Sequence, residues 1–83
     1  MNDNLVKFII EKMEKLDKKI RDINYRVSIF DSGLHDKIVL ELLSQNDIIH
    51  IKYIIPKLEN KCNMLRKQYK NLNVIRLNLL GLI

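Results

Sequence analysis

Apolar residues recur along the first third of the chain at alternating spacings of three and four. The pattern is unbroken over four heptads, which is typical of a coiled-coil helix. Neither Gly nor Pro interrupts it, and Asp3 or Asn4 supplies an N-cap. We therefore predict a helix over residues 4–30, about 40 Å long at a rise of 1.5 Å per residue. Its apolar stripe, called the seam below, consists of Val6, Ile9, Met13, Leu16, Ile20, Ile23, Val27 and Phe30.

Two arrangements would bury this seam. In a parallel homodimer, the β-branched residues at three of the four a positions favour two strands. The flanking charges would then pair Lys12 with Asp17 and Arg26 with Asp31 across the two chains. The alternative is an antiparallel bundle within one chain. Charged residues flank the seam closely after Ile10, which leaves little apolar surface for a second neighbour, so we favour the homodimer.

Turn-forming residues separate this helix from the next apolar segment. Gly33 suits a positive φ at a helix end, and Asp31 or Ser32 suits the cap of a following helix, so a turn is predicted at residues 31–33. A short amphipathic helix over residues 34–44 follows. Residues 44–47 then serve as a connection or as a fresh N-cap.

The remaining apolar pattern indicates a second long helix, over residues 47–79. Residues 48–55 fit both a strand and a helix, and we favour the helix. Pro56 either kinks that helix or begins a new one. A parallel homodimer would set Lys61 opposite Arg66, so this helix is expected to pack inside a bundle. We therefore predict one all-α domain over residues 1–83, a helical hairpin or bundle with a long N-terminal coiled-coil helix, assembled as a dimer.

Charge and hydropathy mark two further segments near the C-terminus. The net charge of +5 arises wholly within residues 57–83, which contain six cationic residues and a single acid, Glu59. These cations are candidates for contact with nucleic acid, an acidic protein or an anionic membrane surface. The apolar C-terminal residues form either a last turn of the core or a docking tail. The cations are Lys57, Lys61, Arg66, Lys67, Lys70 and Arg76, and the tail residues are Leu77, Leu79, Leu80, Leu82 and Ile83.

Residues that could carry catalysis or bind a metal are sparse and scattered. His35, His50 and Cys62 lie 15 and 12 residues apart, unlike the short spacings of a metal site. No phosphate-binding loop or nucleophile motif occurs, so we expect no enzyme activity and no cofactor. The lone cysteine, with an N-terminal stretch lacking a basic flank and an apolar run, predicts an intracellular protein. The apolar stretch at residues 77–83 is too short to span a membrane.

Chain length adds a constraint on assembly. A chain of 83 residues buries only about 60 to 65 % of its unfolded surface, and one cysteine permits no internal disulfide, so a partner chain would add stability. We expect a non-catalytic coiled-coil oligomerisation or adaptor subunit, partnered by a second copy and by another protein of a larger complex. The alternative is a small dimeric nucleic-acid-binding regulator that uses the basic segment 57–76.

Overall fold

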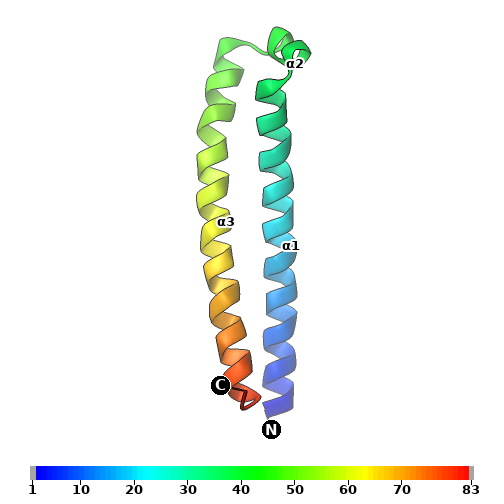
Figure 1. Ribbon diagram of the computed structural model, residues 1–83, viewed down its shortest axis with the longest axis vertical. Helices are drawn as coiled ribbons and strands as arrows, with labels where there is room; N and C mark the ends of the chain where they lie inside the picture. Colours follow the sequence, from blue (N-terminus) through cyan, green and yellow to red (C-terminus); the bar gives the residue numbers. More distant parts are fainter. Residues whose placement is uncertain (1, 83) are drawn as a thin grey trace.

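The computed structural model describes residues 2–82. Two long antiparallel helices, joined through a short helix between them in the chain, make up the structure. The helices are α1 (Asn2–His35), α2 (Lys37–Leu42) and α3 (Gln45–Leu79). They form a rod of 59 × 16 × 15 Å with both ends of the chain at the same end (Figure 1). Residues 2–82 contain no strand, and the predicted all-α hairpin is confirmed.

The first helix extends beyond its predicted end at Phe30. It runs through the expected turn at residues 31–33 to His35, whose Nδ1 donates to the carbonyl oxygen of Asp31 at 2.7 Å. Gly33 has no positive φ and is helical. A glycine inside a helix costs only about 1 kcal/mol, which does not by itself end one. The predicted turn was wrong because a better helix boundary lies just beyond it, at Asp36.

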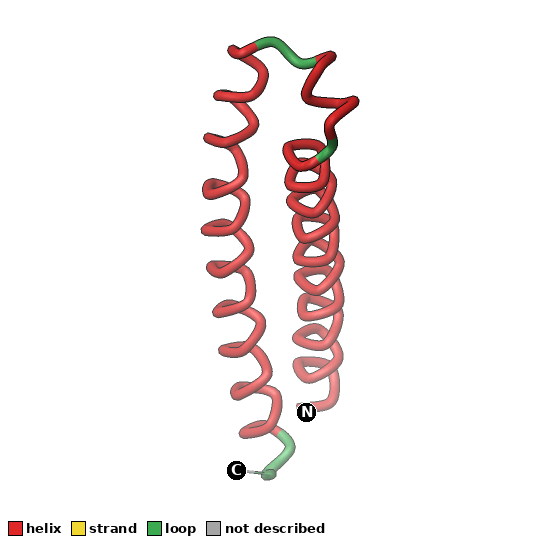
Figure 2. The backbone as a smooth tube through the Cα atoms, turned by 45° about the horizontal axis from the view of Figure 1, so that its top comes forward, coloured by secondary structure: helices red, strands yellow, loops and turns green. Residues whose placement is uncertain are grey.

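Asp36 begins α2, which is shorter than the predicted helix over residues 34–44. Its extended backbone and its carboxylate, which accepts from the Val39 backbone N–H at 2.9 Å, form an N-cap. The helix ends at Leu42, and short loops flank it on both sides (Figure 2). None of its residues is buried, and α2 packs against α1 at the end of the hairpin where the chain passes from α1 to α3 (Figure 1). This end is called the tip below.

A capping box begins α3. The Ser44 hydroxyl accepts from the Asp47 backbone N–H, and the Asp47 carboxylate accepts from the Ser44 backbone N–H, both at 3.1 Å. The fresh N-cap predicted within residues 44–47 is therefore confirmed, as is the helical conformation of residues 48–55. The helix continues through the exposed Pro56, so α3 does not begin anew there.

Gly81, a glycine in the left-handed region, ends α3, and this role of Gly81 was not predicted from the sequence. Gly81 has φ of 73°, and the Leu82 and Gly81 N–H groups donate to the carbonyls of Leu77 and Asn78. This is the Schellman arrangement of a helix C-terminus. Positive φ thus occurs at Gly81, whereas Gly33, where it was predicted, is helical.

The core lies between α1 and α3 and is thin. Ile20 and Ile23 of α1 and Cys62 of α3, which is 2 % exposed, form a buried cluster with Val27 and Leu58 packed against it. Of the eight seam residues, Val6, Ile9, Met13, Ile20 and Ile23 are buried, and Leu16, Val27 and Phe30 are half-buried. Since α1 packs against α3, the seam is covered within the chain.

The two glycines generate opposite stability predictions. A methyl group at Gly33 would lie 3.7 Å from Cγ1 of Val39, an ordinary contact, so Gly33→Ala should raise the free energy of unfolding by about 0.5 to 1 kcal/mol. Gly81→Ala should lower it by about 1 kcal/mol because alanine is strained at positive φ. Urea unfolding followed by circular dichroism measures both. A lower urea midpoint for Gly33→Ala would contradict its helical placement.

The capping box generates a pH prediction. Hydrogen bonds from Ser44 hold the pKa of Asp47 below its ordinary value of 3.8. A carboxylate whose pKa is lowered by folding stabilises the protein above its unfolded pKa, and that contribution disappears as pH falls through the folded pKa. Asp47→Asn should therefore lower the melting temperature at neutral pH, and the difference from the unsubstituted protein should disappear as the pH falls through the folded pKa of Asp47. Glu41→Gln is a matched exposed control, and a pH-independent difference for Asp47→Asn would refute the linkage.

Candidate protein-interaction surfaces

The seam residues predicted as a dimer interface face α3 of the same chain. This is the intrachain arrangement that the sequence analysis set beside the homodimer. A homodimer through the same residues would require the hairpin to open. At the edge of the core, Oδ1 of Asn24 accepts from Cys62 Sγ at 3.4 Å and from Arg66 Nη2 at 3.2 Å. Asn24 therefore links the helices through polar contacts beside the apolar ones.

The six basic residues of the C-terminal third do not share one face. Lys57 and Lys61 line hollows on one side of the hairpin. Arg66 turns toward Asn24, and Arg76 donates to Asn73 and lines a hollow with Glu14 and Asp17. Lys67 and Lys70 are exposed. The predicted basic surface over residues 57–76 is thus divided around α3.

The predicted docking tail is divided as well. Leu77 and Leu79 are half-buried as part of the last turns of α3, whereas Leu80 and Leu82 are exposed. Ile83 lies outside the described residues. The tail therefore contributes to the hairpin through its first half and presents apolar side chains only beyond the end of α3.

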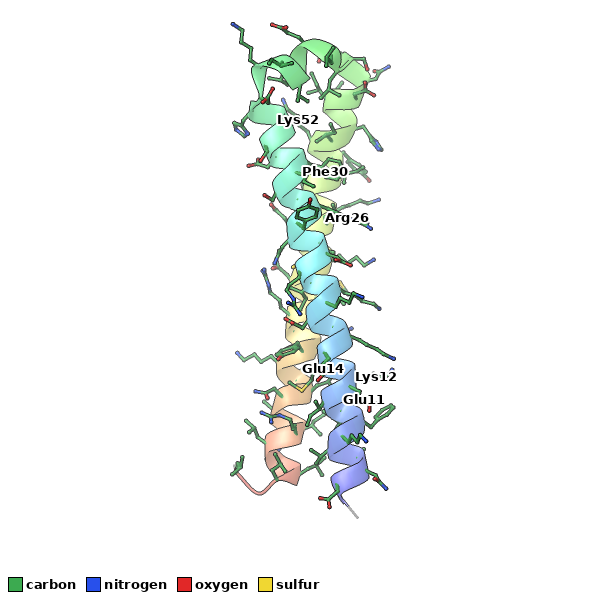
Figure 3. All side chains as sticks on the ribbon, turned by 90° about the vertical axis from the view of Figure 1, so that its right-hand side faces the viewer. Glu11, Lys12, Glu14, Arg26, Phe30 and Lys52 are labelled. Atoms are coloured by element: carbon green, nitrogen blue, oxygen red, sulfur yellow. The ribbon has the colours of Figure 1, made fainter. Side chains whose placement is uncertain are left out.

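A row of cations lines one side of the hairpin, and this row was not predicted. Three adjoining hollows of about 430, 220 and 540 Å³ follow each other between α1 and α3, because Lys19 lines the first two and Arg26 the last two. We call them together the basic groove. Its charged residues are Lys12, Lys15, Lys19, Arg26, Lys57 and Lys61, with Asp22 as the one acid. Lys12 and Arg26, toward the two ends of the row on α1, are labelled in Figure 3.

The floor of the basic groove is apolar. Leu16 and Leu72 line its first hollow, and Phe30 and Ile54 line its last. At the rim, Lys12 Nζ lies 5.5 Å from the centre of the Phe8 ring, and Lys57 Nζ lies 5.0 Å from that of Tyr53. These cation–π contacts, each with a ring one turn earlier on the same helix, favour a fixed position for the two ammonium groups.

The opposite side of the hairpin has a different charge pattern. Its hollow of about 320 Å³ is lined by Glu14, Asp17 and Arg76 among apolar and amide side chains. Asp17 also pairs with Arg21 at 2.8 Å. Acids and bases therefore occur together on this side, and the excess of positive charge lies in the basic groove.

The two most exposed large apolar side chains of residues 3–82 lie at the tip. Ile38 and Leu42 of α2 are 70 % and 81 % exposed, and Ile49 at the start of α3 is also exposed. Beside them lies a hollow of about 430 Å³ whose lining includes Ile29, Val39 and Ile51. The tip thus combines protruding apolar side chains with an apolar recess.

The described residues contain neither a cluster of metal-ligating side chains nor a helix that could cross a membrane. Across residues 2–82, no three His, Cys, Asp or Glu side chains gather into a group suited to a metal ion. None of the helices in this range combines the length and apolar content that crossing a bilayer requires.

The basic groove generates a salt prediction. Six neighbouring cations repel one another, and salt screens that repulsion. Raising NaCl from about 0.02 M to about 0.5 M should therefore raise the urea midpoint of unfolding. Lys19→Gln should reduce this gain more than Lys18→Gln, which removes the same charge from the outward face of α1. A midpoint that falls with salt would show that attractive ion pairs dominate instead.

Comparison of this chain with protein-family models, curated proteins and solved structures finds no match.

Proposed function

We propose that this chain is a non-catalytic assembly subunit, a helical hairpin that pairs with a second copy and carries another protein. The observation that carries the proposal is the imbalance between buried and exposed apolar residues. Among residues 3–82, six hydrophobic side chains are buried, whereas sixteen large ones are at least about a third exposed. A hairpin with so small a core gains stability when further protein surface covers it.

The tip is the surface best suited to the second copy. Self-association through a two-fold axis needs a surface that complements itself. The protruding Ile38 and Leu42 lie beside the recess lined by Val39 and Ile51, so one tip offers both a projection and a hollow to another. Lys37 and Glu41 of α2 balance each other, and the carboxylate of Asp36, which lines the recess, is engaged by the Val39 backbone N–H.

Two other surfaces fit a second copy less well. The seam is already covered by α3. Two basic grooves facing each other would bring like charges together, which is destabilising. We therefore assign homodimer formation to the tip.

Light scattering on a sizing column, over a dilution series, tests this proposal. The expected mass is about twice 9.9 kDa for the unsubstituted protein and 9.9 kDa for Leu42→Glu, which introduces a charge into the apolar tip. Met64→Glu introduces the same charge at an exposed apolar residue midway along α3, away from the tip, and should leave the dimer intact. A monomer at all concentrations, or a dimer that survives Leu42→Glu, would overturn the tip assignment.

A further inference from the structure

We infer that the basic groove binds an acidic amphipathic helix of a partner protein, which would lie between α1 and α3 as a third helix. This inference rests on the proposed assembly function and names the class of partner. It combines three features of the groove, namely its length, its apolar floor and its charged rim.

The groove has the dimensions of a helix-binding site. Its lining on α1 extends from Lys12 to Phe30, about 27 Å at the helical rise of 1.5 Å per residue. That length matches about five turns of a partner helix. The groove runs between two antiparallel helices, so a third helix laid along it would complete a three-helix bundle.

The floor selects an apolar stripe on the partner. Half-buried apolar side chains line each of the three hollows, for example Leu16, Leu65 and Leu58. A helix with apolar residues at i, i+3, i+4 and i+7 can place them on this floor, as in other helix-in-groove complexes. An apolar floor contributes little to contact with phosphates, so these features favour a helix over a nucleic acid.

The rim selects acidic flanks. Lysine and arginine side chains border the floor on both helices, all six of them exposed. Among the side chains of residues 3–82, the one ion pair between Lys or Arg and a carboxylate joins Arg21 to Asp17, away from this rim. The rim cations are therefore available to Glu or Asp on a partner, while a basic helix would be repelled.

The variants for the test come in matched pairs. Lys19→Glu with Lys61→Glu reverses two charges of the rim, one on each long helix. Lys18→Glu with Lys67→Glu makes the same change in charge on the same helices, at exposed positions that line none of the three groove hollows. Both double variants keep the seam and the tip unchanged.

The probes are three fluorescent peptides of about five helical turns and a short random DNA duplex. The first peptide has Leu at heptad positions a and d and Glu at e and g. The second replaces those Glu residues with Lys, and the third replaces the Leu residues with Ser. Fluorescence anisotropy measures the affinity of each probe.

We expect the acidic amphipathic peptide alone to bind, with an affinity at least about tenfold weaker for the Lys19/Lys61 variant and changed less than about twofold for the Lys18/Lys67 variant. Failure of this peptide to bind, equal loss in both variants, or equal binding of the Ser peptide would overturn the inference. If the DNA duplex binds more tightly than the acidic peptide, the inference is overturned and the groove is a nucleic-acid-binding site instead.

The tip variant separates the two proposals. Leu42→Glu should abolish the dimer and leave peptide binding intact, since α2 lies outside the groove. If the unsubstituted protein is monomeric and binds the acidic peptide, the tip dimer alone is refuted. A dimer that ignores the peptide would refute the groove assignment alone.

Discussion

Burial of the α1 seam against α3 is the contact on which the rest of the structure depends. It centres on Ile20, Ile23 and Cys62 and fixes the rotation of each long helix about its own axis. Once those rotations are fixed, the residues beside the seam are assigned to one flank or the other. Lys19 and Lys61 come to one flank, and Glu14 and Arg76 to the other. The surface charge pattern is therefore a consequence of the core.

Local patterns in the sequence predicted the helices well. The heptad spacing identified the seam, and Ser44 with Asp47 identified the beginning of α3, because both signals arise within a few residues of chain. The end of α1 was less predictable. Gly33 is compatible with a helix at modest cost, and the decisive cap at Asp36 competed with Asp31 and Ser32.

The interaction surfaces depended on information that spacing alone does not contain. A heptad stripe fits a second copy and a neighbouring helix of the same chain equally well, so the partner of the seam was decided by the antiparallel packing of α3. The basic groove was not predicted for a related reason. Residues 1–56 sum to zero charge, yet the helix places Lys12, Lys15 and Lys19 on one flank and Glu14 and Asp17 on the other. Heptad positions, read together with the sign of each charge, would have indicated it.

The hairpin topology also sets the order in which contacts can form. Contacts near α2 close short loops, whereas Asn24 and Cys62 are 38 residues apart in the sequence. Met13 and Tyr69, which line one hollow, are still further apart in the sequence. The entropic cost of closing a loop rises by about 0.6 kcal/mol with each doubling of its length. Contacts between α1 and α3 should therefore form first near the capped tip and then successively toward the free ends. Fraying follows the reverse path, and the end that holds Leu80 and Leu82 is the first to separate.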